Sequence, residues 1–352
     1  MIIVNMKEVI KNEECLISGW SQLPMNAKYF LERKRIRVVS CERLAGESKP
    51  VYKIVTEDGA LVLKHNPKGS GLMARFRRLI FGSLGFDREI QFYQNASKAQ
   101  CADYIAGYVA SDPNNLLIEL LPTKKGRAWA PRGQEWVVLA NGLLSLHWKS
   151  GINDSGFRAF VHRSIYGPVG VALRIGFPCV RAEFGWWLAL RYVMKLLNCI
   201  WKQPRLSRRH LCHNDFLPNN ILFSEDSSEV FFIDFQDVTM SSRWPLFDLM
   251  RISWHIEISG DNGFDNEFIQ AYIDGMDSDV RESLNFHAQV EFGLLICLVH
   301  SFRWRKLHGG DRSELTNSLL RLIVGDGANP VYLKIKNQLA DSLCQKYKEC
   351  KK

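Results

Sequence analysis

The sequence predicts an α+β fold in two lobes, a small antiparallel β-sheet followed by a larger, mostly helical part. Short apolar and β-branched segments, separated by turn residues, fill the first third of the chain. Pro122 ends the last of them, and apolar stretches with helical spacing follow. A chain of 352 residues, of which 46% are hydrophobic, can bury one large bilobal core or two small domains.

Four strands are predicted in the first lobe. A loop at residues 45–50 separates the first two, and the turn Glu57-Asp58-Gly59 leads into the third. The fourth is apolar and ends at Pro122, since proline cannot continue a hydrogen-bonded ladder beyond it. The predicted strands are residues 37–44, 51–55, 60–64 and 115–122.

The most informative segment of the chain begins at His213. His213, Asp215 and Asn220 form the pattern H-x-D-x-x-x-x-N, and Asp234 follows at the end of an apolar segment. Phosphoryl transfer from Mg-ATP requires this arrangement in kinase-type sites. Asp215 is the candidate base that holds and deprotonates an acceptor hydroxyl. Asn220 and Asp234 are the candidate magnesium ligands, because their oxygen atoms are hard donors.

Asn220 and Asp234 are predicted to lie on adjacent strands of a β-hairpin. Residues 221–223 and 230–233 are short and apolar, and the turn-prone residues 224–228 separate them. The loop pattern alone occurs by chance in roughly one or two chains in a hundred of this length. A correctly spaced Asp-Phe pair after it makes an accidental match much rarer.

These motifs resemble those of a known family. His213, Asp215 and Asn220, followed by I-D-F-Q-D at 233–237, resemble the aminoglycoside phosphotransferase and choline kinase superfamily of small-molecule kinases. Eukaryotic-type protein kinases are less similar, because Gln236 replaces the glycine of their D-F-G motif and no A-P-E segment follows. The resemblance implies a bilobal protein kinase-like fold, with a small antiparallel sheet and one main helix in the first lobe.

The resemblance assigns nucleotide-binding roles to the first lobe. Lys64 ends the third strand, where the family places the lysine that pairs with the α- and β-phosphates, and Glu89 in an R-E-x-x-F-Y segment is its partner. Gly46 and Ser48 are the candidates in the phosphate-covering loop, which departs from G-x-G-x-x-G in having a single glycine. The resemblance also makes residues 115–122 an edge strand leading into a hinge, where main-chain groups from Glu119 to Leu121 are predicted to bind the adenine edge.

Supporting roles and lobe boundaries are also implied. His213 and Asp248 are assigned to scaffolding of the catalytic loop, and Asp237 is a minor candidate for a further acidic group near the metal. Asp248 lies in a segment that resembles the P-x-x-Y-D-L motif of the small-molecule kinases. The implied organisation is a lead segment at 1–34, a nucleotide-binding lobe at 35–121 and a second lobe at 122–352 with the catalytic loop, metal site, acceptor pocket and basic tail.

The implied activity is transfer of the γ-phosphate of ATP to a hydroxyl of a small molecule, with ATP and Mg²⁺ as cofactors. The acceptor classes are sugars, amino sugars, aminoglycosides and amino alcohols. Two alternatives remain open, a membrane-associated kinase acting on a glycolipid or lipid-linked sugar, and a non-catalytic nucleotide-binding pseudokinase. The intact set of Lys64, Asp215, Asn220 and Asp234 argues against the pseudokinase. The sequence selects neither the acceptor nor the oligomeric state.

Two segments depart from the family core. Residues 72–81 interleave three arginines with phenylalanine, leucine and isoleucine, and such a segment can bind an anionic membrane surface or an acidic substrate. The alternative is that its apolar face packs on the first lobe while the arginines are solvated. Residues 157–178 precede the catalytic loop, and the resemblance places acceptor selection there.

Charge and cysteine usage limit the partners and the compartment. A net charge of +9 is compatible with nucleic acid, an anionic membrane or anionic substrates, but no nucleic-acid-binding motif accompanies it. Nine cysteines without a C-x-x-C pair predict neither a disulfide framework nor a zinc site. The expected location is the cytoplasm, with the inner face of the membrane as the alternative.

Residues 184–201 are predicted to form a core helix that precedes the catalytic loop. Arg191 and Lys195 interrupt the apolar run and argue against a membrane span. Five large apolar side chains recur at helical spacing, namely Trp187, Leu190, Met194, Leu197 and Trp201.

Overall fold

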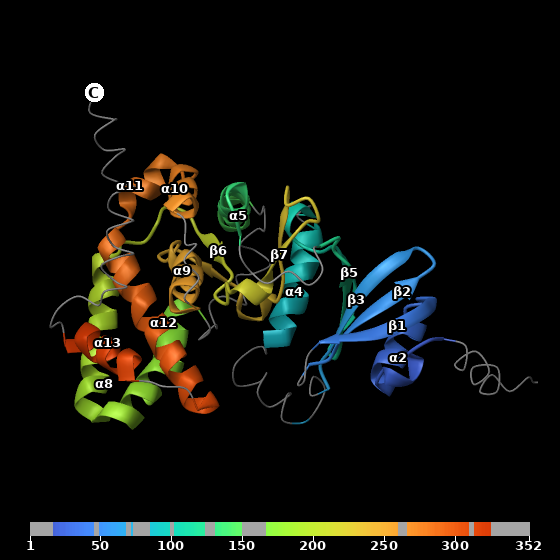
Figure 1. The fold of residues 1–352 in the computed structure, drawn as a ribbon, viewed down its shortest axis with the longest axis horizontal. Helices are drawn as coiled ribbons and strands as arrows, with labels where there is room; N and C mark the ends of the chain where they lie inside the picture. Colours follow the sequence, from blue (N-terminus) through green and yellow to red (C-terminus); the bar gives the residue numbers. More distant parts are fainter. Residues whose placement is uncertain are drawn as a thin grey trace, which may run out of the picture. The chain divides into compact units, whose positions relative to one another are not determined.

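The computed structural model describes residues 17–45, 49–67, 72, 85–98, 102–123, 131–149, 167–259, 266–309 and 313–324. The chain divides into two compact units, Met1–Pro122 and Thr123–Lys352. Among the described residues, the first unit contains a five-stranded sheet with two α-helices, and the second is mostly helical (Figure 1). The predicted α+β class with a small antiparallel sheet and a mostly helical second part is therefore confirmed.

The first unit is built on a five-stranded antiparallel sheet with the strand order β1-β2-β3-β5-β4. Its strands are β1 (Val38–Ala45), β2 (Val51–Thr56), β3 (Gly59–His65), β4 (Tyr108–Asp112) and β5 (Asn115–Glu119). Its helices are α2 (Met25–Arg33) and α4 (Gly85–Lys98), with short 3-10 turns at Trp20–Gln22 and Ala102–Tyr104. The first three predicted strands are confirmed to within one residue at each end.

The prediction that the fourth strand lies at the sheet edge is wrong. β5 lies between β3 and β4, so β4, which the sequence did not reveal, is the edge strand on this side of the sheet. The tight turn between them explains the pairing. The Asp112 carboxylate accepts the backbone N–H groups of Asn114 and Asn115 at 2.8 and 2.9 Å, which folds β5 back onto β4. Pairing on both sides is consistent with the burial of residues 115–118.

The two faces of this sheet are covered by different helices. Leu63 of β3 and its partner Leu117 of β5 belong to a core cluster that also contains Phe30 and Leu31 of α2. Side chains alternate along a strand, so Lys64 points to the opposite face, where it contacts α4. Figure 1 shows α2 and α4 on the two sides of the sheet. The described part of the predicted lead segment, from residue 17 onward, thus packs as part of this unit.

The second unit is a helical assembly that carries two small two-stranded sheets. Helix α12 packs against α8, α9 and α13, and α10 packs against α5 (Figure 1). Trp244, just before α9, stacks on Phe292 of α12 with ring centroids 3.7 Å apart. The helices are α5 (Gln134–Leu144), α7 (Pro168–Val171), α8 (Phe177–Lys202), α9 (Phe247–Ser259), α10 (Asn266–Asp274), α11 (Ser278–Ser283), α12 (Phe286–His308) and α13 (Ser313–Val324). The strands are β6 (His210–Cys212), β7 (Ile221–Phe223), β8 (Val230–Phe232) and β9 (Thr239–Ser241), paired as β6–β9 and β7–β8.

The predicted helix at 184–201 forms as part of α8, but the face predicted to be buried is exposed. The helix forms, with a break at Gly185, whose φ of +82° lies in the left-handed region that favours glycine. Its buried face consists of Ala189, Tyr192, Leu196 and Cys199. The five large side chains at helical spacing lie two positions away from these, on the exposed face. Apolar residues occupy both faces of α8, so periodicity alone could not tell which face was buried. No helix among the described residues is long and apolar enough to cross a membrane.

Candidate active site

The loop that follows β6 carries the candidate base. The Asp215 carboxylate receives two side chains: Arg251 of α9 lies 2.9 Å from Oδ1, and Asn220 Nδ2 donates to Oδ2 at 3.2 Å. Asn220 Nδ2 also donates to the Asp215 carbonyl at 2.8 Å. The Arg251 side chain is 9% exposed and that of Asp215 is 34% exposed. The carboxylate is therefore held from a buried side while it remains accessible to a reactant.

The two candidate metal ligands lie beside each other at the base of the β7–β8 hairpin. Asn220 ends a 3-10 turn, Pro218–Asn220, directly before β7, and Asp234 follows β8. The Ile233 N–H donates to the Asn220 carbonyl at 3.0 Å, which joins the residue before Asp234 to Asn220 itself. Because the Asn220 NH₂ group donates to Asp215, its amide oxygen is the atom that remains as a metal donor. This arrangement agrees with the predicted hairpin.

Asp234 is held in an uncommon backbone conformation. Its φ of +64° and ψ of +59° lie in the left-handed region, which costs an L-residue about 1 kcal/mol and which aspartate tolerates better than most. Gln236 Nε2 donates to Asp234 Oδ1 at 2.6 Å. Residues held in such conformations cluster at functional sites, where the surroundings fix the direction of a side chain.

Asp248 connects the catalytic loop to helix α9. Its carboxylate accepts the backbone N–H of His213 at 2.6 Å and that of Asn214 at 2.7 Å, and it lies 3.0 Å from His147 Nε2. Burial of Asp248 opposes its ionisation, but the hydrogen bond from His147, the nearby His147 and His213 rings and the His213 N–H together hold its pKa below the ordinary value. His213 Nε2 in turn donates to the Ile233 carbonyl at 2.9 Å. The two predicted scaffold residues thus connect the loop, the helix and the metal-side strand.

Several residues of this network were missed by sequence reasoning. Arg251 could have been predicted from the sequence, because it lies three positions after Asp248 and residues with this spacing share a helix face. Asn214 has a φ of +66°, and its side chain donates to the Asp237 carbonyl at 2.6 Å and the Thr239 hydroxyl at 2.7 Å. The Tyr272 hydroxyl donates to the Pro245 carbonyl and lies 2.6 Å from His147 Nδ1. The sequence carried no comparable signal for Asn214 or Tyr272.

In the first unit, the predicted lysine and glutamate are paired. Lys64 Nζ lies 2.5 Å from Glu89 Oε1, with the two side chains 12% and 0% exposed. Gly46 and Ser48 lie outside the described residues, so their predicted role stays a prediction. In the predicted adenine-binding segment, the Glu119 N–H donates to the Gly107 carbonyl and the Leu120 N–H to the Ala60 carbonyl. The main chain of Leu121 is therefore the better candidate for an adenine contact.

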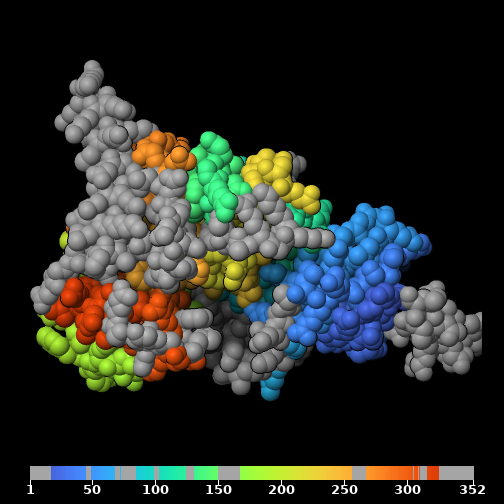
Figure 2. Space-filling model, in the orientation of Figure 1, coloured from blue at the N-terminus to red at the C-terminus, as the bar shows by residue number. Residues whose placement is uncertain are grey.

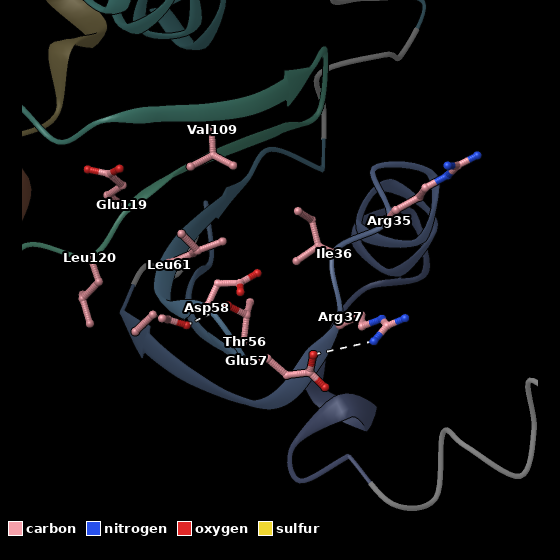
Figure 3. Close-up of a pocket in the computed structure, with 12 residues that line it drawn as sticks. Arg35, Ile36, Arg37, Thr56, Glu57, Asp58, Leu61, Val109, Glu119 and Leu120 are labelled. Carbon is pink, nitrogen blue, oxygen red and sulfur yellow. Dashed lines mark hydrogen bonds and ion pairs between the residues drawn. The ribbon is translucent and has the colours of Figure 1, made fainter.

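A hollow of about 680 Å³ opens on the α2 side of this sheet (Figure 3). Leu61 and Glu119, which are paired across β3 and β5, line it together with Arg35 and Arg37. Arg37 lies 3.7 Å from Glu57 at its edge (Figure 3). Lys64 points to the other face of the sheet, so this hollow is separate from the Lys64–Glu89 pair. The Glu119 side chain belongs to the hollow and not to the face that carries Lys64.

The two segments predicted to contact a membrane or the acceptor are largely undescribed. Residues 73–81 and 157–166 lie outside the described residues. Cys212, next to the catalytic loop, is fully buried, and burial raises the pKa of its thiol well above the ordinary value. A thiol held neutral in this way is a poor nucleophile. Cys212 is therefore not a candidate nucleophile.

Comparison with known proteins agrees with this geometry. A phosphotransferase enzyme family model matches residues 180–284, which include Asp215, Asn220, Asp234 and Asp248. Among solved structures, the ADP-bound aminoglycoside phosphotransferase APH(2″)-Ib is 16% identical, with a TM-score of 0.54 over 86% of this chain and 97% of that chain. The gentamicin complex of APH(2″)-IIa is 14% identical, with a TM-score of 0.54 over 88% and 98%.

A third structure, choline kinase LicA from Streptococcus pneumoniae, is 15% identical, with a TM-score of 0.51 over 86% of this chain and 99% of that chain. The chain has the fold of the aminoglycoside phosphotransferase and choline kinase superfamily. The predicted resemblance to this superfamily is confirmed. The expectation of a phosphotransferase is confirmed as well, because the matching family model describes phosphotransferase enzymes. No curated protein sequence matches the chain.

Proposed function

We propose that this protein transfers the γ-phosphoryl group of Mg-ATP to a hydroxyl group of a small molecule. The observation that carries the proposal is the Asp215 carboxylate, which Arg251 and Asn220 hold on a loop fixed by Asp248. A carboxylate fixed in this way, and still partly exposed, suits a base that accepts a proton from a bound hydroxyl. The Asn220 and Asp234 oxygens, on joined segments next to it, suit a metal-bound phosphate.

In the proposed reaction, the acceptor hydroxyl oxygen forms a bond to the γ-phosphorus while the bond from that phosphorus to the β,γ-bridging oxygen breaks. The hydroxyl proton passes to Asp215, and ADP leaves with the bridging oxygen. The transition state is loose, so the chain contributes mainly by positioning the reactants and neutralising charge. Arg251 and Asn220 set the direction of the carboxylate that receives the proton.

The donor atoms fit magnesium, which takes hard oxygen ligands and keeps several waters. Asn220 Oδ1 and the Asp234 carboxylate would hold it, and when bound it neutralises charge on the phosphates. Lys64, oriented by Glu89, is the proposed cation for the α- and β-phosphates.

An ADP-release screen tests the proposal. The full-length protein would be supplied with Mg-ATP and a panel of sugars, amino sugars, aminoglycosides, choline-like alcohols and glycolipids. Asp215→Ala is the blank, and Asp279→Asn, which changes an acidic residue of α11, is the matched control. We expect acceptor-dependent ADP release in the wild type and the control but not in the blank. ATP binding without acceptor-dependent release across the panel would favour the non-catalytic alternative.

One observation favours a second candidate, a kinase acting on a glycolipid or lipid-linked sugar. Helix α8, in the same unit as the catalytic loop, exposes tryptophan and leucine side chains beside arginines. Such a surface is compatible with an acceptor presented by a lipid. Comparing each glycolipid in vesicles with its water-soluble headgroup in the same screen would separate the two candidates, since only the lipid-directed enzyme should prefer the vesicle form.

A further inference from the structure

Helix α8 presents an exposed apolar stripe after the break at Gly185. We call it the tryptophan face, formed by Trp186, Trp187, Leu190, Met194, Leu197 and Trp201. Trp187 is 70% exposed and Trp201 is 89% exposed. At 1.5 Å per residue the stripe is about 22 Å long. Figure 2 shows the yellow-green atoms of α8 at the surface of the second unit.

The stripe is more than scattered exposure. Single exposed leucines are ordinary, but a continuous run of large apolar side chains on one helix face marks an interaction site in a soluble protein. The opposite face of α8 is already buried: the Tyr192 hydroxyl donates to the Ala172 carbonyl, and Cys199 contacts Glu291 of α12. The tryptophan face remains exposed and can contact a partner.

The charges around the face are basic. Helix α8 contains four basic residues and one acidic residue, Glu183, which is paired with Lys306. The Arg181 guanidinium lies 4.8 Å from the centre of the Trp186 ring, and that of Arg191 lies 5.8 Å from the Trp187 ring. Lys202 and Arg205, at the end of the helix and just beyond it, are also exposed. Cations thus border the stripe along its length, in a chain of net charge +9.

We propose that the tryptophan face of α8 binds the surface of an anionic lipid bilayer. Tryptophan places an apolar ring in the acyl boundary and its N–H among headgroups, while arginine extends its charge toward lipid phosphates. A helix with an apolar stripe and basic borders lies in the plane of such an interface. Charge complementarity distinguishes this occupant from a second copy of the chain. A two-fold contact would place this basic-bordered face against an identical face of the same charge, and like charges oppose that contact.

This surface is distinct from residues 72–81, the segment for which the sequence predicted membrane contact. It lies outside the proposed catalytic groups, so lipid binding can be measured without reference to phosphoryl transfer. Trp187, Met194 and Trp201 contribute the exposed apolar area, while Arg191 and Lys202 contribute the charge. Substitutions can therefore separate the two contributions.

Co-sedimentation of the full-length protein with vesicles tests the inference. Phosphatidylcholine vesicles with and without phosphatidylglycerol would be compared at low and high salt. We expect binding only to the anionic vesicles, weakened by salt because exposed charges are screened. The double variant Trp187→Ser with Trp201→Ser should lower the partition coefficient by about tenfold, since it removes the two most exposed rings. Arg191→Gln should reduce the salt dependence.

Tyr29→Ser is the matched control, because Tyr29 is a 61% exposed aromatic residue of α2 in the first unit. It should leave vesicle binding unchanged, and thermal unfolding should show that all variants are folded. Wild-type protein that ignores anionic vesicles, or a double variant that binds them as well as the wild type does, would overturn the inference. Self-association of the wild type that the double variant abolishes, without vesicle binding, would assign the face to a second copy instead.

Discussion

The Arg251 guanidinium lies 2.9 Å from the carboxylate of Asp215 and ties helix α9 to the catalytic loop. The same helix holds that loop a second time, because Asp248, three residues earlier, accepts the backbone N–H groups of His213 and Asn214. One helix thus fixes both the main chain of the loop and the side chain of the proposed base. A proton acceptor must keep its direction through the reaction, and small displacements of positioned groups reduce rates steeply.

Substituting Arg251 should therefore lower kcat more than it alters the KM for ATP. We expect Arg251→Met to reduce kcat by about tenfold to a hundredfold, because Asp215 loses one of the two side chains that orient it. Arg251→Lys should recover part of the loss, since it keeps the charge but not the planar pair of donors. Steady-state kinetics with an acceptor found in the screen would measure both constants.

Arg251 is largely buried, so the stability of its variants has to be measured in parallel. Thermal unfolding separates a loss of folded protein from a loss of turnover, and rates would be corrected for the folded fraction. If Arg251→Met and Arg251→Lys lose kcat equally after this correction, the contact does not orient the base. A rise in the KM for ATP with unchanged kcat would contradict the assignment as well.

Substitutions of Asp215 and Asp234 should have different effects on phosphoryl transfer and on nucleotide binding. Asp215→Ala should lower the rate of phosphoryl transfer roughly 10²- to 10⁴-fold, which is the usual contribution of a general base. Mg-dependent nucleotide binding should stay nearly intact. Asp234→Ala should weaken nucleotide binding in the presence of Mg²⁺ and change it little in its absence, because it removes a proposed metal ligand. Calorimetric titration with a non-hydrolysable ATP analogue, with and without Mg²⁺, distinguishes the two. Unchanged phosphorylation by either variant would refute its assignment.

The Lys64–Glu89 pair allows stability and nucleotide binding to be separated. Lys64→Met leaves the Glu89 carboxylate, which is 0% exposed, without this cation, and such a change costs about 3–5 kcal/mol of stability. Adding Glu89→Leu removes the buried charge, and apolar replacement of a buried pair is often neutral. We expect the double variant to regain stability in denaturant titrations without regaining ATP affinity. Recovery of both would show that Lys64 has only a structural role.

Predictions from the sequence succeeded where a short pattern of residues determines the local backbone conformation. The order of Asp215, Asn220 and Asp234 along the chain was sufficient to predict a loop followed by a hairpin, because turn and strand signals act over a few residues. The first three strands were also readable, since Gly59 and apolar alternation mark them. These features need no knowledge of what packs against them.

The rest depended on tertiary contacts. Arg251 reaches Asp215 across thirty-six positions, and the contact follows from how α9 packs on the loop. β5 became an interior strand because the Asp112 turn brings β4 beside it. Helix α8 has apolar side chains on both faces, and only its packing against neighbouring elements, including the turn that carries Ala172, decides that Tyr192 is buried and Trp187 exposed.

Two histidines of the second unit should make the fold sensitive to mild acid. The pKa of His210 is lowered from its ordinary 6.5 to about 3, mainly by burial and secondly by the nearby His147. The pKa of His300 is also lowered to about 3, mainly by burial and secondly by the neighbouring Arg251, Arg303 and Arg174. Between pH 6.5 and 3 the unfolded chain therefore binds protons that the folded chain does not. The stability that this contributes is full above pH 6.5 and is lost as the pH falls.

Each such histidine should make stability fall by about 1.4 kcal/mol per pH unit within that window. His210→Phe should remove about that much from the slope, because the ring that packs 4.9 Å from Trp148 is kept while the titrating group is lost. Asp248, with its pKa below the ordinary 3.8, adds acid sensitivity only below that value and does not disturb the comparison. Denaturant titrations of the wild type and His210→Phe, at several pH values between 6.5 and 4, measure the two slopes. Equal slopes would mean that His210 is protonated in the folded protein, contrary to its burial against Trp148.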